Sequence, residues 1–473
     1  MRFRSKHLAK ATTLLALWLT AGCASYYQAN QSFNQEFERG NLQAALATLQ
    51  SNTKEANSKR EFLYYVNNGL VLSMTGQYEE SNRYFEKAYL FGEDYRINYL
   101  NEVASYLTNP TITTYRGEDH EHLMVLYYKA INYLKLGNTQ AALVECRRVN
   151  TRLQQLSDRY SSNEKYQRDA FIHTLMGLIY ESDKDYNNAF IAYRNALAVY
   201  EEDYSRLFRA HTPQQLKVDL LRTAWLSGLT EEFEFFKAKL QMPEYEYKPH
   251  TGGEVIFFWH NGLAPIKAEW GLTFAVNKRD NWVYFYNEQL GISFPFSLDG
   301  YDQKDKDGLG NLQIFRVAFP RYLERPQFYS QATIATNEAE LPLQLLEDVN
   351  QIAFKSLQQR MHLELSKALI RAALKKVTEN QLRKEDKALG SVLGVINAIT
   401  EKADTRNWQT LPHSIYYTRL ALPEGKSSIT LKLQTGAQTD THTFNYQLTR
   451  GQILFHTFSS LESRYPNYGQ FGY

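Results

Sequence analysis

The sequence lacks the local signatures of the common enzyme classes. Its 473 residues contain no His-Glu-X-X-His motif of zinc proteases, no Gly-X-Ser-X-Gly nucleophile elbow and no evident cysteine and histidine nucleophile pair. Gly425-Lys426-Ser427 ends like a phosphate-binding loop, but that loop needs a glycine five residues before Gly425, where Leu420 stands. We therefore expect no catalytic residue and no bound cofactor.

Metal-ligand spacing is also missing. The acidic loop that ends at Gly308 has Gln303 at the first ligand position of a calcium loop, and Ile314 where a bidentate glutamate belongs. His120 and His122 stand two residues apart, so they would not share one face of a helix. Both stretches are interpreted as surface loops, and no metal site is expected.

The apolar run Ala11–Ala21 is too short to span a membrane. Four basic residues precede it and small residues follow, which is the pattern of an export signal. Without those four, the 53 Lys and Arg residues fall to 49, against 51 Asp and Glu, a formal net charge of −2. No excess of positive charge then remains, and we expect no nucleic-acid partner.

The end of this segment, Leu19-Thr20-Ala21-Gly22-Cys23, resembles the bacterial lipobox, although Thr20 stands where that motif most often has leucine. The resemblance implies that residues 1–22 are removed and that Cys23 becomes a lipidated first residue. An ordinary cleaved signal with a chance cysteine is the alternative. Because no Asp follows Cys23, the sorting rule of Gram-negative lipoproteins implies the outer membrane, with the protein facing the periplasm. Residues 23–32 are expected to form a lipidated tether.

Cysteine is scarce, with two in the whole sequence. Once Cys23 carries lipid, Cys146 has no partner for a disulfide within the chain. Cys146 falls in a helical pattern at a position that suits a medium apolar side chain. It is therefore expected to be a buried structural thiol.

Residues 33–242 show helical periodicity with small and aromatic positions that recur about every 34 residues, which resembles the tetratricopeptide repeat. Gly69, Ser81 and Ala88 would allow close helix crossing, with Gly76 at the bend. Further units are expected around Ala130 and Gly177, with weaker ones near Gly40 and Gly228.

A stacked array of this kind leaves a concave groove along its first helices. The candidate groove residues on those helices are Tyr65, Tyr127, Tyr128, Lys129 and His173. Two interpretations stay open: the groove binds another protein, or the chain's own C-terminal half fills it.

The C-terminal half is predicted to be an α+β domain over residues 252–460, followed by a tail at 461–473. Runs rich in β-branched and aromatic residues predict strands over 254–335 and 413–458. Apolar residues three to four apart predict a helical hairpin over 341–404. Since neither block of strands has an evident second layer, the hairpin is expected to cover the apolar face of the sheet.

Several stretches of this half resemble a poorly characterised family of Gram-negative lipoproteins with repeats in front and this type of domain behind. They are Glu254-Val255, 262–265, 346–349, the string Ala-Asp-Thr-Arg-Asn-Trp-Gln-Thr-Leu-Pro at 403–412, and 422–425. The family implies no known activity, and it implies envelope work linked to peptidoglycan synthesis. From the residues alone, an ion pair of Asp404 with Arg406 and the indole of Trp408 would lock a corner of the fold.

The leading hypothesis is a non-enzymatic lipoprotein that acts as a scaffold or adaptor for envelope proteins. Its predicted fold is a helical repeat array followed by a β-rich domain with an inserted hairpin. The alternative is an enzyme acting on peptidoglycan or polysaccharide, with Asp404, Glu347 and Asp348 converging in a cleft. A third possibility is a protein with a self-filled groove whose strands assemble into a multimer.

Overall fold

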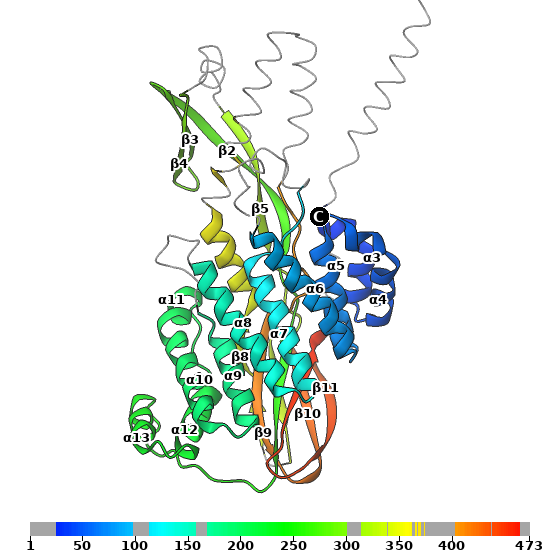
Figure 1. Ribbon diagram of the computed structural model, residues 1–473, viewed down its shortest axis with the longest axis vertical. Helices are drawn as coiled ribbons and strands as arrows, with labels where there is room; N and C mark the ends of the chain where they lie inside the picture. The colour runs from blue at the N-terminus through cyan, green and yellow to red at the C-terminus, as the bar shows by residue number, and fades with distance from the viewer. Residues whose placement is uncertain are drawn as a thin grey trace, which may run out of the picture.

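The computed structural model describes residues 25–97, 113–157, 168–299, 314–337, 339–361, 403–436 and 438–463, with a few helical positions between 365 and 373. A helical N-terminal region is followed by a β-rich region (Figure 1). Within the described part of the chain, no helix combines the length and apolarity needed to cross a membrane. The signal segment and Cys23 lie outside the described residues.

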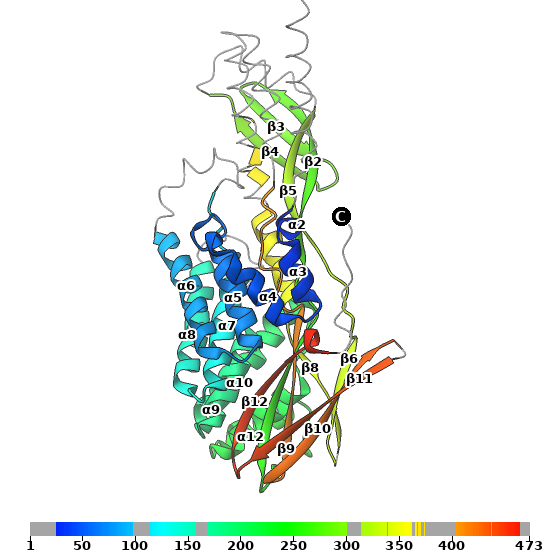
Figure 2. The ribbon, with the colours of Figure 1, turned by 90° about the vertical axis from the view of Figure 1, so that its right-hand side faces the viewer.

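Consecutive helices pack side by side in one stack (Figures 1 and 2). The helices are α2 (Tyr26–Ala29), α3 (Gln31–Glu38), α4 (Leu42–Ser51), α5 (Glu61–Met74), α6 (Tyr78–Ile97), α7 (Asp119–Lys135), α8 (Thr139–Ser157), α9 (Ala170–Ser182), α10 (Tyr186–Val199), α11 (Ser205–Phe208), α12 (Gln214–Leu226) and α13 (Thr230–Lys239). A π-helical turn, Tyr200–Tyr204, continues α10 into α11.

Small residues allow the helices of a pair to cross closely. The ring of Phe85 lies against Gly69 so tightly that a side chain there would overlap it, and the Ser81 hydroxyl donates to the Gly69 carbonyl at 2.6 Å. The α5–α6 turn bends at Gly76, whose φ of 79° lies in the left-handed region that glycine adopts without strain. Lys184, with a φ of 63°, takes the equivalent place between α9 and α10.

In the part of the chain that the structure describes, the strands form three four-stranded sheets. Sheet A has the order β12 (Ile453–Ser459), β1 (Gly253–Asn261), β9 (Ser414–Leu422), β8 (Gln344–Asp348); sheet B has the order β4 (Ile292–Ser297), β3 (Trp282–Asn287), β2 (Ile266–Arg279), β5 (Ile314–Leu323); sheet C has the order β11 (Gln438–Leu448), β10 (Gly425–Thr435), β6 (Gln331–Ala335), β7 (Glu340–Pro342). In sheet A, β1 runs parallel to β12 and antiparallel to β9, so strands far apart in the sequence share one sheet.

Sheet A is the middle layer of the molecule. Ile256 and Phe258 of β1 belong to the same apolar core as the helices, whereas Val255, Phe257 and Trp259 pack against sheet C. Figure 2 shows the helices on one side of β1 and β9, and β10 and β11 on the other. The repeat array covers sheet A, and Val349 and Ile352 of the helix that follows β8 belong to the same core. The expectation that the hairpin supplies this layer therefore holds in part, because the described hairpin residues share the layer with the array.

The predicted hairpin at 341–404 begins too early. Residues 340–342 and 344–348 are strands β7 and β8, and the helix starts at 349. β8 pairs with β9, and this pairing overrides the local helical spacing. Ala353, Leu357 and Leu369 of the following helix cover the inner face of sheet B. The second helix of the hairpin falls outside the described residues.

Two predicted loops are also helical. In the expected tether at 23–32, the described residues form α2 and the start of α3, with Tyr26 and Tyr27 buried. The expected surface loop at His120 and His122 is the first turn of α7, and both imidazoles are buried. Their neighbour Glu121 explains this, because it completes a capping box on Glu118 at the start of that helix.

Candidate functional site

The five candidate groove residues lie on α5, α7 and α9, but not on an open face. Tyr127, Tyr128 and Lys129 are buried, while Tyr65 and His173 are partly exposed. The Tyr65 hydroxyl donates to Glu61 at 2.7 Å. Burial, with Arg168 nearby, lowers the pKa of His173 to about 4. The structure therefore brings these residues onto one series of helices, where three of them are buried and Tyr65 and His173 remain partly exposed.

The β-rich region fills the face of α7. The Tyr127 hydroxyl lies 2.7 Å from Nε2 of His260 on β1, and Tyr128 packs against the Trp408 ring. Burial lowers the pKa of His260 to about 3, so the imidazole is neutral at physiological pH. Lys129 turns instead into the array, where Glu145 pairs with it at 2.9 Å.

Residues 403–412 are the main segment of the β-rich region that fills the groove. They contain no strand, and they contact α3, α5 and α7. Gln409 donates to Asn34 of α3, Thr410 to Asn67 of α5, and the Trp408 amide to Glu121 of α7, at 2.6 to 2.7 Å. In each contact, a buried polar group of the helices forms a hydrogen bond with a polar group of residues 403–412. At these positions, the chain's own C-terminal half therefore fills the groove.

The predicted ion pair of this segment is present. Arg406 contacts Asp404 through two guanidinium nitrogens, each at 2.8 Å, and its third nitrogen reaches the carbonyls of Lys59 and Thr113. Trp408 is buried against Phe85 and Tyr128. Asp404 and Arg406 thus have a structural role, as expected, and they join residues 403–412 to the helical region.

Glu121 is the buried acid at the centre of this contact. Its carboxylate accepts from the Trp408 amide, the Tyr115 hydroxyl at 2.8 Å and the Glu118 amide at 2.9 Å. Burial raises the pKa of Glu121 to about 7, although the hydrogen bonds from Trp408 and Tyr115 oppose the shift.

At the other end of the interface between the helices and the β-rich region, the buried contacts are ion pairs. Arg419 of β9 donates to both oxygens of Glu181 of α9, at 2.7 and 3.0 Å, and it also pairs with Glu254 of β1. Arg222 of α12 binds the same Glu181 at 2.7 Å and Asp219 at 2.6 Å. Burial alone would raise the pKa of Glu181, but the two guanidinium groups hold it well below its usual value.

The carboxylates of the enzymatic hypothesis do not converge. Asp404 is paired with Arg406, and Asp348 caps the helix that follows by accepting from the Gln351 amide at 2.9 Å. Glu347 is buried and accepts from Tyr204 at 2.9 Å; burial, followed by the nearby Asp169, raises its pKa well above the usual range. The void beside Glu347 measures about 20 Å³, room for a water but not for a sugar.

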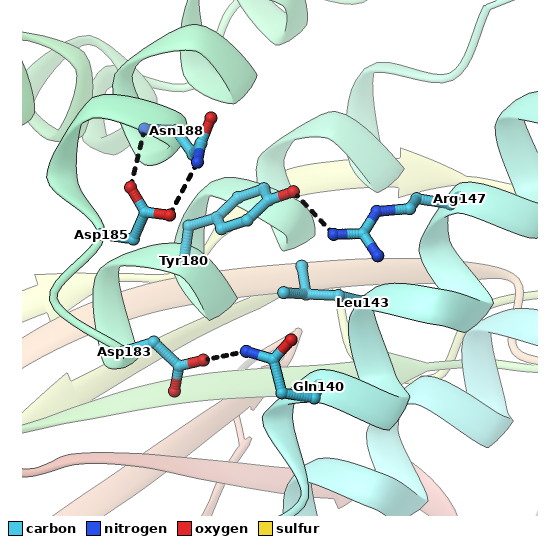
Figure 3. A pocket seen from close by; sticks show the side chains of 7 residues that line it. All are labelled: Gln140, Leu143, Arg147, Tyr180, Asp183, Asp185 and Asn188. Atoms are coloured by element: carbon cyan, nitrogen blue, oxygen red, sulfur yellow. Dashed lines mark hydrogen bonds between the residues drawn. The ribbon is translucent and has the colours of Figure 1, made fainter.

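A larger hollow opens on the outside of the helical stack, with a volume of about 520 Å³ (Figure 3). It lies between α8 and the turn that joins α9 to α10. The lining residues are Gln140, Leu143, Arg147, Tyr180, Asp183, Asp185 and Asn188. Figure 3 shows Arg147 reaching Tyr180, with a hydrogen bond of 3.2 Å, on one side and the two aspartates on the other.

The hollow carries separated charges on a small apolar floor. Asp183 accepts from Gln140 at 2.9 Å, and Asp185 accepts from Asn188, so both carboxylates are held in place. Leu143 is buried beneath them. Such a surface fits a partner segment with one cationic and one anionic group around an apolar side chain. Among the described residues, no group of three His, Cys, Asp or Glu side chains could hold a metal ion.

Sequence reasoning missed this hollow and the buried ion network. Glu181 and Arg419 are 238 residues apart, and no local pattern connects them. One signal was available, since Arg419 interrupts an apolar strand and Glu254 precedes another. A charge within such a strand needs a buried partner. Cys146 is buried, as expected, and burial raises the pKa of its thiol.

No protein-family model matches the sequence, and no curated protein is similar to it. Among solved structures, BtubC (BKLC) from P. vanneervenii is 14% identical over 46% of this chain and 81% of that one, with a TM-score of 0.31. A tetratricopeptide repeat protein from Parabacteroides merdae is 15% identical over 47% of this chain and 80% of that one, with a TM-score of 0.21. TM-scores this low do not establish a common fold.

Proposed function

We propose that this chain is a lipid-anchored scaffold of the Gram-negative cell envelope, which binds another envelope protein through the outside of its helical array. The lipobox-like segment at Cys23 supports the anchor, and the family resemblance of 403–412 supports the envelope setting. The paired helices act as a tetratricopeptide-like array. The placement is the outer membrane, facing the periplasm.

One observation carries the binding role. Sheet A and residues 403–412 occupy much of the inner face of the array, and a polar hollow of about 520 Å³ opens on the helices at Arg147 and Asp183. Its size lies in the range of ligand pockets. A rigid array with a filled inner face presents such a recess in fixed geometry, which reduces the entropy lost on binding.

The test is photo-crosslinking in cells from an unnatural amino acid at Asn188. We expect a covalent adduct with an envelope protein, and we expect its yield to fall when Asp183→Lys and Arg147→Glu reverse the charges of the hollow. The same crosslinker at the exposed Gln43 of α4 is the matched control. An adduct that forms equally at Gln43, or that survives charge reversal, would contradict the assignment.

The anchor is tested separately. Replacing Cys23 by Ser should release the protein from the membrane fraction and block processing by the lipoprotein signal peptidase. Unchanged processing and fractionation of the Cys23→Ser protein would refute the lipid anchor and leave the crosslinking result unaffected.

A further inference from the structure

Sheet B has one covered face and one exposed face. Leu272, Phe274 and Val276 of β2 point inward and pack on the helix that follows β8, while the residues between them are exposed. Three large side chains lie on the exposed face: Trp282 at 41% exposure, Tyr286 at 40% and Ile314 at 65%. Side chains of this size are normally covered in a β-sheet, so the exposed face has the character of a contact surface.

Strand register makes these side chains contiguous. Ala275 of β2 stands opposite both Tyr286 of β3 and Ile314 of β5. In the next row towards the tip, Tyr284 stands between Asn277 and Pro295, and in the last row Trp282 stands opposite Arg279. Directly opposite residues lie about 5 Å apart within a row, and diagonal neighbours in adjacent rows lie about 7–8 Å apart, which is within reach of aromatic side chains. We call the surface formed by Ala275, Trp282, Tyr284, Tyr286, Pro295 and Ile314 the aromatic face.

The charged residues in the strands of sheet B are mostly basic. Its four strands contain five basic residues and one acidic residue. The basic residues are Lys267, Lys278, Arg279, Arg316 and Arg321, and the acidic residue is Glu269. Lys267 pairs with Glu118 in the interior, whereas Arg279 and Arg316 are exposed on the side of the sheet that carries the aromatic face. Glu269 is exposed on the same side, and Asp280 and Glu288 stand in the adjoining turns, so Arg279 and Arg316 form local positive sites that could bind anionic groups.

The described chain begins near the base of this sheet. The Tyr26 amide donates to the Thr405 hydroxyl at 3.2 Å, and the Ala403 amide donates to Glu269 of β2 at 2.9 Å. Cys23 precedes Ser25 by two residues, which extend at most about 7 Å. From Glu269, β2 continues for ten residues to its end, or about 33 Å. Figure 2 shows sheet B extending past the helices from the level of α2.

From these observations we infer that the aromatic face docks on the surface of an anionic lipid bilayer. Tryptophan and tyrosine partition to the bilayer interface because their rings are apolar and their N–H or O–H groups reach water. Arg279 and Arg316 bind the headgroup phosphates. The inference rests on the proposed lipid anchor for its orientation: one end of sheet B is held near Cys23, and the aromatic face supplies a second contact that lays the sheet along the membrane.

The bilayer explains the composition better than a second protein copy does. Two copies joined by this face would bury Arg279 and Arg316 of both copies in one interface, and taking charges out of water is costly. A glycan would use the aromatic rings but not the aliphatic Ile314 and Pro295. Binding to soluble peptidoglycan fragments and self-association are therefore the competing outcomes of the test.

The test uses residues 24–473, which contain every described residue and lack the lipid. Binding is measured by co-sedimentation with vesicles of phosphatidylglycerol and phosphatidylethanolamine, and with vesicles of phosphatidylcholine alone. We expect binding to the anionic vesicles, weakened by salt. Neutralising both arginines, Arg279→Ser with Arg316→Ser, should weaken binding about 25-fold, at about fivefold for each charge. The pair Trp282→Ser and Tyr286→Ser should weaken it about tenfold or more.

Trp225→Ser is the matched control, since Trp225 is also exposed, at 49%, but lies on α12. It should leave vesicle binding unchanged. Unfolding curves of all variants establish that they fold. The inference is overturned if the wild-type chain does not bind anionic vesicles at low salt, if the Trp282 and Tyr286 variant binds as well as the control, or if the aromatic face drives self-association or glycan binding instead. The Cys23→Ser fractionation tests the anchor independently.

Discussion

Sheets A and B belong to the same β-rich region but have opposite surroundings. Sheet A lies between the helical array and sheet C, and all but one residue of β1 is buried. Within the described residues, the helix that follows β8 covers one face of sheet B, and the other face is exposed. The difference follows the sequence: β1 reads as a continuous apolar run, Val-Ile-Phe-Phe-Trp, whereas β2 alternates apolar and polar residues.

The comparison also distinguishes the charges of sheet A, which contribute to stability, from those of sheet B, which are available for binding. Sheet A uses its charges internally, in the network of Arg419 with Glu181 and Glu254. Sheet B presents Arg279 and Arg316 to solvent beside exposed aromatic residues. Matched substitutions in the two sheets should therefore have different effects on the free energy of unfolding.

The largest difference is expected for arginine. Arg419→Met removes the cation that neutralises Glu181 and Glu254 and leaves buried carboxylates short of a partner, which should cost about 5 kcal/mol. Arg316→Met on sheet B should change stability by less than about 0.5 kcal/mol. Urea unfolding at neutral pH measures both. Similar losses for the two variants would contradict the layered assignment of the sheets.

Tryptophan offers the second comparison. Trp259 of β1 is fully buried, with its ring 4.9 Å from Tyr416, and Trp259→Ala should cost about 3–5 kcal/mol. Trp282→Ala on the aromatic face should cost less than about 1 kcal/mol in free protein. Thermal unfolding followed by circular dichroism distinguishes the two; a larger loss for Trp282→Ala would mean that the aromatic face is covered.

Lowering the pH should reduce the stability of sheet A before that of sheet B. Burial lowers the pKa of His260 to about 3, below its unfolded value of about 6.5. Between these values the unfolded chain binds the proton and the folded chain does not, so stability falls as the pH drops below about 6.5, by up to about 1.4 kcal/mol per pH unit for each such histidine. Urea unfolding at several pH values should show a shallower pH dependence in His260→Gln. An unchanged slope would contradict a buried, neutral imidazole.

Glu181 and Glu254 should extend this loss to lower pH. The arginines hold the pKa of both carboxyls below the unfolded value of about 4.5, overcoming the opposing effect of burial. Their contribution is therefore present above about pH 4.5 and is lost as the pH falls towards the folded values. Sheet B has no histidine in its strands.

The smallest expected difference in stability comes from removing the hydroxyl group of a tyrosine. Tyr127→Phe removes the partner of buried His260 and should cost about 1–2 kcal/mol, whereas Tyr286→Phe on the exposed face should be nearly neutral. Differences of this size are measured as shifts in the urea midpoint at constant slope. Equal midpoints for the two variants would argue that Tyr127 is solvated.

Much of the local structure was visible in the sequence. The last four strands, the turn at Gly76 and the close crossing at Gly69 follow from alternation, from glycine and from small residues. The boundary at 341–348 was misassigned because Leu345 and Leu346 also fit a helical spacing, and the pairing with β9 that decides the matter is encoded about 70 residues away. Local pattern does not determine such pairings.

The candidate site was harder to predict. Sequence spacing placed Tyr127 and Tyr128 on the first helices but left open whether a partner or the chain itself covers them. Asn34, Asn67 and Glu121 meet 403–412 through single hydrogen bonds across 287 to 375 residues. No periodicity connects such positions, so the self-filled groove is visible only in three dimensions.

The most direct test of the account is whether the β-rich region occupies the inner face of the helical array in solution. Cysteines replacing Asn67 and Thr410, whose side chains are buried and 2.7 Å apart, should form a disulfide on mild oxidation, and mass spectrometry would identify the 67–410 link. Cysteines at Asn188 and Thr410 serve as the control and should not be joined. Failure to form the 67–410 link in folded protein, or an equal yield from the control pair, would contradict the self-filled groove.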